Sequence, residues 1–225
     1  AAMAMTSANA QVYDNIQDYE FDCFSEMGKF ISAANINSGV TILNRYTGQQ
    51  YDFFDPQLAV IYACFGISNN GIAVGNNGYC ACYWKDGKEI ELPQPAEGDD
   101  AHDCMGNAFS VSANGKYIVG GVSTGAGYSA DMMEPVIWTL QADGTYSYEV
   151  LPYDKTDFSG RAPQYISTQC ISEDGKFAVV QVRDYSGVVM YPVFYTKQDN
   201  GTWTRKTFGA GFFWDEEKIA ALPEM

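Results

Sequence analysis

Short apolar stretches alternate with turn residues along this chain, and one such arrangement occurs four times. Each copy has an apolar residue, a serine, two variable residues, a glycine and then a second apolar stretch. Apolar runs of this length, bounded by turn residues, predict β-strands. The four copies span Phe24–Ile31, Ile67–Val74, Val111–Ile118 and Ile171–Ala178.

The serine and the glycine of each copy predict a tight turn between two strands. Glycine readily adopts the positive φ that closes such a turn, and a serine hydroxyl can bond a backbone N–H just ahead of it. We therefore interpret these residues as structural and give the serines no nucleophilic role. The turn residues are Ser25, Gly28, Ser68, Gly71, Ser112, Gly115, Ser172 and Gly175.

A second hairpin is predicted after each of these turns. A strand, carrying an aromatic residue in the last three copies, leads through a glycine-containing turn into another strand. Each repeat therefore has four predicted strands, and the serines are 43, 44 and 60 residues apart. Blade-type repeats run to about 40–50 residues. The expected fold is all-β, a β-propeller-like array of four antiparallel four-stranded blades plus a partial C-terminal repeat.

The expected domain is 11–225, with a partial repeat at 209–225. The interval from Trp214 to Pro223 equals that from Trp84 to Pro93, so the tail repeats half of the unit. Either the chain is a fragment of a longer propeller, or its terminal strands close a ring with the first repeat. We favour the fragment, which would leave an open edge prone to self-association. Residues 215–221 could instead form a helical turn. The blades are expected at about 20–58, 59–98, 104–155 and 164–208.

The run from Ile67 to Gly75, followed by Trp84 and by Leu92-Pro93, resembles the HAF-type repeats of extracellular bacterial proteins. The layout is also similar to a WD-type β-propeller blade, although the signature His and the Trp-Asp dipeptide are absent. The resemblance covers about residues 20–223. It implies a four-stranded repeat in an exported protein, and it carries no catalytic residues over to this chain.

Composition and charge narrow the range of partners. Sixteen Tyr, thirteen Phe and 22 Gly fit strands joined by tight turns. The net charge is −15 with only 13 basic residues, whereas a nucleic-acid-binding protein needs Lys and Arg against phosphates. Nucleic acid and anionic membrane are therefore excluded as expected partners, and no apolar run reaches the length of a membrane span.

The start of the chain points to export. Small residues ending in Ala8-Asn9-Ala10 are typical of the cleavage site of a secretory signal. We interpret residues 1–10 as a signal-peptide remnant; a flexible, disordered start is the alternative. The expected location is secreted, periplasmic or at the cell surface.

The cysteines are too sparse for a small disulfide scaffold, and most are expected to be buried thiols. Cys80 and Cys82, two residues apart, would share one face of a strand. Cys23 and Cys170 each lie two residues before the serine of their repeat, so we expect them to be structurally equivalent and not bonded. The six are Cys23, Cys64, Cys80, Cys82, Cys104 and Cys170.

One acidic loop holds the only histidine, in the run Asp99, Asp100, His102 and Asp103. Three carboxylates beside an imidazole could bind a divalent cation; the alternative is a solvated acidic loop. The segment Lys197–Trp203 resembles the Asp-box turn of sialidase-like propellers but lacks the residue between Gly and Thr, so a hairpin turn is expected there.

We expect a non-enzymatic, exported binding module that recognises a protein or a glycan, with no cofactor unless the acidic loop holds a cation. Aromatic residues in the loops 124–135 and 153–163 could stack sugars or grip a peptide. The alternative is a propeller-type hydrolase or lyase acting on extracellular polysaccharide, although its carboxylates cannot be chosen from 28 acidic residues. A third possibility is a structural domain of a larger surface protein.

Overall fold

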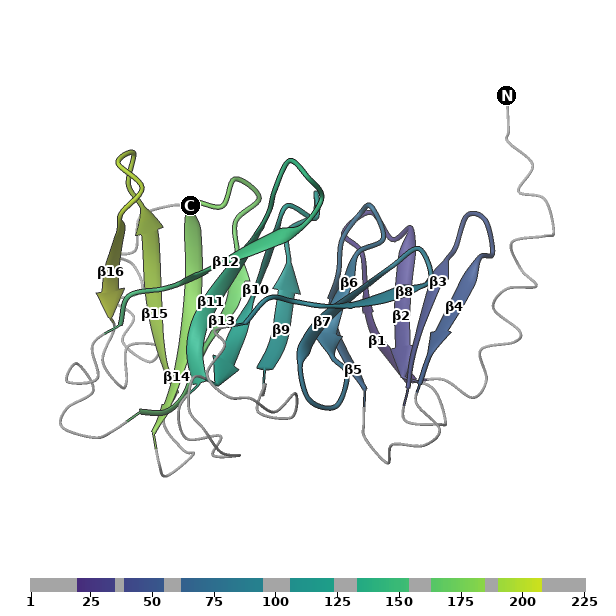
Figure 1. Cartoon of the computed structure of the whole chain (residues 1–225), viewed down its shortest axis with the longest axis horizontal. Helices are drawn as coiled ribbons and strands as arrows, with labels where there is room; N and C mark the ends of the chain where they lie inside the picture. The colour runs from purple at the N-terminus through teal and green to yellow at the C-terminus, as the bar shows by residue number, and fades with distance from the viewer. Residues whose placement is uncertain are drawn as a thin grey trace, which may run out of the picture.

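The structure is a computed structural model that describes residues 20–34, 39–54, 62–94, 106–123, 133–153, 163–184 and 190–207. Within these ranges the chain forms sixteen β-strands and their turns, and it forms no helix. Strands that follow one another in sequence pair antiparallel in groups of four. The four groups, called units 1 to 4, lie side by side (Figure 1). The all-β prediction with four strands per repeat is therefore confirmed.

Units 1 and 2 are separate sheets with strands in sequential order. Unit 1 contains β1 (Glu20–Phe24), β2 (Phe30–Ala34), β3 (Val40–Asn44) and β4 (Gln50–Phe53). Unit 2 contains β5 (Ala63–Ile67), β6 (Ala73–Asn76), β7 (Ala81–Lys85) and β8 (Lys88–Glu91).

Units 3 and 4 are joined into one eight-stranded sheet by a short parallel pairing of β11 with β13, at Met133 and Tyr165. Unit 3 contains β9 (Gly106–Val111), β10 (Tyr117–Ser123), β11 (Met133–Leu140) and β12 (Tyr146–Val150). Unit 4 contains β13 (Pro163–Ile171), β14 (Phe177–Asp184), β15 (Met190–Lys197) and β16 (Trp203–Thr207). No sheet closes on itself within the described residues.

The hydrophobic core is divided into three layers, one between each pair of successive units. Side chains alternate between the two faces of a strand, so one strand supplies two layers. In β6, Ala73 packs toward unit 1 while Val74 packs toward unit 3. In β10, Ile118 and Val122 pack toward unit 2, and Val119 packs toward unit 4. Each inner sheet is thus buried on both faces.

In units 3 and 4 an aromatic residue of the third strand donates a hydrogen bond to the preceding unit, whereas in unit 2 the indole N–H of Trp84 donates to Glu89 of its own unit at 3.1 Å. Trp138 of β11 donates its indole N–H to the carbonyl of Pro93 in unit 2, at 2.7 Å. Tyr195 of β15 donates its hydroxyl to the carbonyl of Pro152 in unit 3, at 2.8 Å. The Leu-Pro pairs of the sequence pattern therefore present a backbone acceptor to the next unit. Both aromatic side chains are buried, and each packs in the layer that it helps to close.

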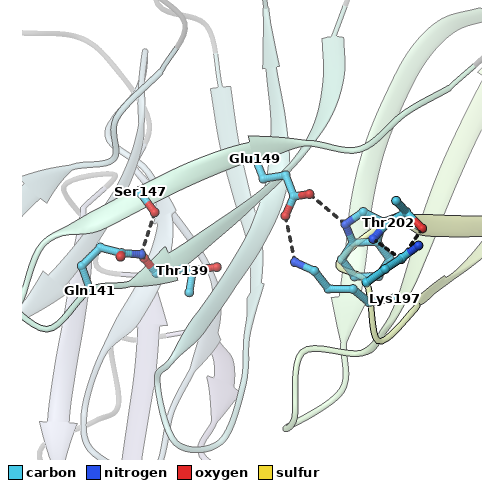
Figure 2. A network of polar contacts seen from close by, with 8 residues as sticks. Thr139, Gln141, Ser147, Glu149, Lys197 and Thr202 are labelled. Atoms are coloured by element: carbon cyan, nitrogen blue, oxygen red, sulfur yellow. Dashed lines mark hydrogen bonds and ion pairs between the residues drawn. The ribbon is translucent and has the colours of Figure 1, made fainter.

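A further contact between units 3 and 4 lies at the surface. Glu149 of β12 accepts hydrogen bonds from the Lys197 ammonium at 3.1 Å and from the indole N–H of Trp203 at 3.0 Å (Figure 2). The ion pair is more than a third exposed on both sides, so solvent screens it and its contribution to stability is small. It fixes the edge of unit 4 rather than supplying its main stabilisation.

All four units share an irregularity in the pairing of their first two strands. The register shift falls between Phe21 and Cys23 in unit 1, between Cys64 and Gly66 in unit 2, between Val119 and Gly120 in unit 3 and between Thr168 and Cys170 in unit 4. Such bulges bend a strand and change the direction of its side chains. Cys23 and Cys170 lie at these irregularities, each in the first strand of its unit.

We expect Tyr195→Phe to lower the free energy of unfolding by about 1 kcal/mol, because it removes the hydrogen bond to Pro152 and keeps the ring. Urea unfolding followed by tryptophan fluorescence measures the change. Tyr148→Phe is the matched control, since Tyr148 is well exposed and its loss of a hydroxyl should leave the unfolding midpoint unchanged. Equal midpoints for both variants would contradict a role for the Tyr195 hydroxyl in joining the units.

Candidate functional site

The four Ser-x-x-Gly segments form the same turn in every unit. The glycines have positive φ, between 64° and 82°, and each glycine N–H donates to the serine carbonyl at 2.7–3.1 Å. Each serine hydroxyl accepts a backbone N–H from a residue just before or at the start of the strand that follows, as in Ser112, where the donor is Tyr117 at 3.0 Å. The bonds to the other serines are 2.9–3.1 Å long. Each serine hydroxyl is thus engaged in hydrogen bonds that hold its own turn.

The residue at the third position of the turn differs between unit 1 and the other three units. Asn70, Asn114 and Asp174 each accept a hydrogen bond from the serine hydroxyl of their own turn. Bonds from Ser172 and from the backbone N–H of Lys176 lower the pKa of Asp174. In unit 1 the same position is Met27, which has no such acceptor and is 74% exposed. Met27 is therefore not explained by the geometry of the turn.

The turns lie in a row and contact one another from unit to unit. The backbone N–H of Met27 donates to the Asn69 side chain at 2.9 Å, and the Asn69 N–H donates to the Ala113 carbonyl at 2.8 Å. The Asn114 amide donates to the Glu173 carbonyl at 3.3 Å. One edge of the array is therefore a continuous line of hydrogen-bonded turns.

Three of the four turn glycines are covered by a side chain from the preceding unit. A methyl group added to Gly71 would lie 2.8 Å from the Phe30 ring, and one added to Gly175 would lie 2.3 Å from the Tyr117 ring. Over Gly115 the nearest atom is the Asn70 amide oxygen at 2.7 Å, with the Ile72 side chain at 2.8 Å. The missing side chain of each of these glycines thus makes room for side chains of the preceding unit, which are aromatic at Gly71 and Gly175.

Gly28 is the exception among the described residues. Of the residues that the structure describes, and apart from the chain neighbours of Gly28, only Arg45 comes within 4 Å of the position that a methyl group would take there, with its guanidinium at 3.3 Å. Arg45 also donates to the Gly28 carbonyl at 2.8 Å. Beside this turn lies an open hollow of about 660 Å³, called the unit 1 hollow. Its lining residues are Asp22, Cys23, Phe24, Glu26, Met27, Gly28, Ile31 and Arg45.

Two large apolar side chains at the unit 1 hollow are exposed to solvent. Phe24 is 73% exposed, whereas Ile67, its counterpart in unit 2, is 7% exposed. Met27 is the other. Most exposed apolar residues need no explanation, but these two lie together beside a concavity and an uncovered glycine. Comparing the four repeats position by position would have singled out Met27, because the other units have Asn or Asp there.

A second, smaller hollow of about 250 Å³, called the inter-unit pocket, lies between units 1 and 2. Its walls combine a tyrosine and a phenylalanine ring with amide, carboxylate and ammonium groups. This mixture can bond sugar hydroxyls and stack on a sugar face. The lining residues are Lys29, Phe30, Ile42, Asn44, Gln49, Tyr51, Asn70, Gly71 and Asp86.

Several predicted features lie outside the described residues, among them the acidic run Asp99, Asp100, His102 and Asp103. The first ten residues, Cys104, the partial repeat 209–225 and most of the loops 124–135 and 153–163 also lie outside them. Within the described ranges no group of three or more His, Cys, Asp or Glu side chains could hold a metal ion. Those ranges also contain no helix long and apolar enough to cross a membrane.

The segment Lys197–Trp203 runs from the last residue of β15 through a turn to the first residue of β16. Asn200 accepts the backbone N–H of Thr202 at 3.0 Å, and Gly201 has a φ of 84°. The same arrangement occurs in unit 3, where Asp143 accepts the N–H of Thr145 at 3.0 Å. The segment resembling an Asp box is thus a hairpin turn that two units share.

The described cysteines differ in their surroundings. Cys64, Cys80 and Cys82 are buried, Cys23 is half-buried and Cys170 is exposed. Cys80 lies in the bend before β7, not in the strand with Cys82. The sulfur of Cys23 lies 4.0 Å from that of Cys64 in unit 2, a proximity that the sequence pattern did not indicate.

No family model matches the chain, and no curated protein is similar to it. Among solved structures, the tricorn protease is similar over 76% of this chain, with a TM-score of 0.46 and 14% identity. Porphyromonas gingivalis dipeptidyl peptidase 4 is similar over 82% of this chain, with a TM-score of 0.37 and 8% identity. The chain spans only 17% and 38% of those two proteins. A likeness at this level assigns no activity.

We expect Gly175→Ala to destabilise the protein by more than Gly201→Ala, by about 1–3 kcal/mol. Both glycines have positive φ, at 71° and 84°, so both substitutions carry a similar backbone strain of about 1–2 kcal/mol. Only the methyl group at 175 meets the Tyr117 ring; nothing lies within 4 Å at 201. Urea unfolding of the two variants measures the difference, and equal losses would show that the covered glycine adds nothing.

Proposed function

We propose that the four units are consecutive blades of a β-propeller-like array, and that the protein is an exported, non-enzymatic binding module. The shared turn, the shared bulge and the shared contacts between units support a blade-type repeat. The residues Ala8-Asn9-Ala10 support export to the periplasm, the cell surface or the medium. We further propose that its partner is a polypeptide and that the unit 1 hollow binds it.

One observation carries the choice of a polypeptide. In units 2 and 4 the turn glycine receives an aromatic ring from the preceding unit, and in unit 3 it receives Ile72 together with the Asn70 amide, whereas the described residues supply no apolar side chain to Gly28. The equivalent position in unit 1 is bordered instead by exposed Phe24 and Met27. An aromatic or aliphatic side chain of a partner would occupy it as Phe30 and Tyr117 occupy the others. Methionine and aromatic residues are also enriched in protein interfaces.

The charges at the hollow indicate which side chains should flank that apolar group. Among the described residues that line the hollow, Asp22 and Glu26 are acidic and Arg45 is the one cation, and the chain as a whole has a net charge of −15. Complementary charge steers association and sets specificity more than affinity. The preferred segment therefore has an aromatic or aliphatic residue with Lys or Arg beside it.

A glycan is the second candidate ligand, because the walls of the inter-unit pocket are suited to sugar hydroxyls. Tyr51 supplies a ring, Gln49 and Asn70 supply amides, and Asp86 supplies a carboxylate. On a glycan array, binding that Tyr51→Ala or Asn70→Ala removes would favour this pocket over the unit 1 hollow.

The alternative to a binding module is a propeller-type hydrolase or lyase acting on extracellular polysaccharide. Glycoside cleavage requires two carboxyl groups on opposite sides of the scissile bond, and Asp22 and Glu26 line the same hollow. Release of reducing sugar from polysaccharide that is lost in both Asp22→Asn and Glu26→Gln would support an enzyme and overturn the non-enzymatic proposal.

We expect the wild-type protein to select peptides with an aromatic or aliphatic residue beside Lys or Arg from a displayed library of random linear 12-mers. The double variant Phe24→Ala, Met27→Ala should weaken the best of these peptides by at least about tenfold, because it removes the apolar wall. Fluorescence polarisation with the labelled peptide measures the affinity at low and at physiological salt.

Tyr46→Ala is the matched control for this experiment. Tyr46 is a large, exposed aromatic residue of unit 1 that does not line the hollow, so its loss should change the affinity by less than about twofold. Equal affinities for the wild type and the double variant would place the peptide site elsewhere. Selection of no peptide, together with binding on the glycan array, would replace the polypeptide with a sugar.

A further inference from the structure

We infer that Cys23 and Cys64 form a disulfide that joins unit 1 to unit 2 when the protein meets a small-molecule disulfide. The two residues come from the first strands of neighbouring units, β1 and β5, and are separated by 41 positions in sequence. Their sulfur atoms are 4.0 Å apart as free thiols. The bond would be a covalent link across the layer between the two units.

The local backbone suits this pair. A disulfide needs its sulfurs about 2.05 Å apart, so the two sulfurs must approach each other by about 2 Å. Both strands have a register shift at these positions, between Phe21 and Cys23 in unit 1 and between Cys64 and Gly66 in unit 2. A bulge is a place where a strand can bend and turn a side chain toward a new partner.

The two thiols have different roles, which their surroundings assign. Hydrogen bonds from the thiol of Cys64 and from the hydroxyl of Ser32, whose oxygen is 3.0 Å away, lower the pKa of Cys23. The bond to Cys23, together with burial, raises the pKa of Cys64 well above its ordinary value. Cys23 is therefore the thiol of this pair that ionises more readily.

Access favours the same order of events. Cys23 is half-buried and lines the open unit 1 hollow, whereas Cys64 is only 4% exposed. A small disulfide can reach Cys23 from the hollow. Cys64 would then act on the opposite side of the Cys23 sulfur, from within the layer between the units.

The reaction proceeds by two thiol–disulfide exchanges. The Cys23 thiolate attacks one sulfur of the small disulfide, which forms a mixed disulfide and releases one small thiolate. Cys64 loses its proton to solvent and attacks the Cys23 sulfur, which releases the second small thiolate. The two cysteines are oxidised by two electrons and lose two protons, and the small disulfide is reduced to two thiols.

The test treats the native protein with 2-hydroxyethyl disulfide, a neutral reagent that the acidic hollow does not repel. After acid quenching, free thiols are alkylated and the digest is analysed by mass spectrometry. We expect a peptide pair linked through Cys23 and Cys64. Cys64→Ser should stop at a mixed disulfide on Cys23, and Cys23→Ser should give no reagent adduct at Cys64.

Cys170→Ser is the matched control, because Cys170 has the equivalent place in unit 4 and is exposed. It should leave the Cys23–Cys64 link at the wild-type yield. Circular dichroism of each variant verifies folding before the reaction. A wild-type protein that stops at a mixed disulfide on Cys23, or that links Cys23 to another cysteine, would overturn the inference.

Two further measurements distinguish a disulfide that the native structure accommodates from one that forms by distorting it. Release of the second small thiol requires ionised Cys64, so its rate should rise about tenfold per pH unit through the neutral range. The linked protein should also melt about 5–15 °C higher than the Cys64→Ser variant, because the link closes a loop of about 40 residues in the unfolded chain. A linked protein with a lower melting temperature would mean that the bond distorts the native layer.

Discussion

Burial of both sheet faces is the constraint on which the other features of this structure depend. An inner unit has no polar face, so its strands supply apolar residues to two layers at once, as Ala73 and Val74 do in β6. Such a sheet is not stable alone, since both of its apolar faces would meet water. The turn row, the covered glycines and the bonds to Pro93 and Pro152 all hold neighbouring sheets at the separation that this burial needs.

Much of the architecture could be read from the sequence because it depends on local rules. Ser112 and Gly115 predict a turn, since few residues other than glycine adopt a positive φ without a cost in free energy. The apolar runs on either side of that turn then place two strands. The contacts between units could not be read in the same way. Any residue has a carbonyl, so nothing in the sequence marks those of Pro93 and Pro152 as the acceptors for Trp138 and Tyr195.

The candidate site was harder to find for a related reason. Phe24 and Met27 are ordinary apolar residues in the sequence, and their exposure follows from which sheet lies against the turn. Cys23 and Cys64 approach each other beside bulges in two different units, and register shifts of one residue leave little trace in composition. Cys23 and Cys170 occupy equivalent positions in their repeats, but the contacts of each sulfur atom depend on the unit that lies beside it.

The contacts that join units use few side chains on the receiving side. Gly175 of unit 4 presents only a glycine to Tyr117 of unit 3, and Pro152 of unit 3 presents only a backbone carbonyl to Tyr195 of unit 4. Neither receptor depends on a particular neighbouring side chain. The donor can be Trp138 in one unit and Tyr195 in another. An exchange of an indole donor for a phenol donor at this position therefore needs no change in the unit that receives the hydrogen bond.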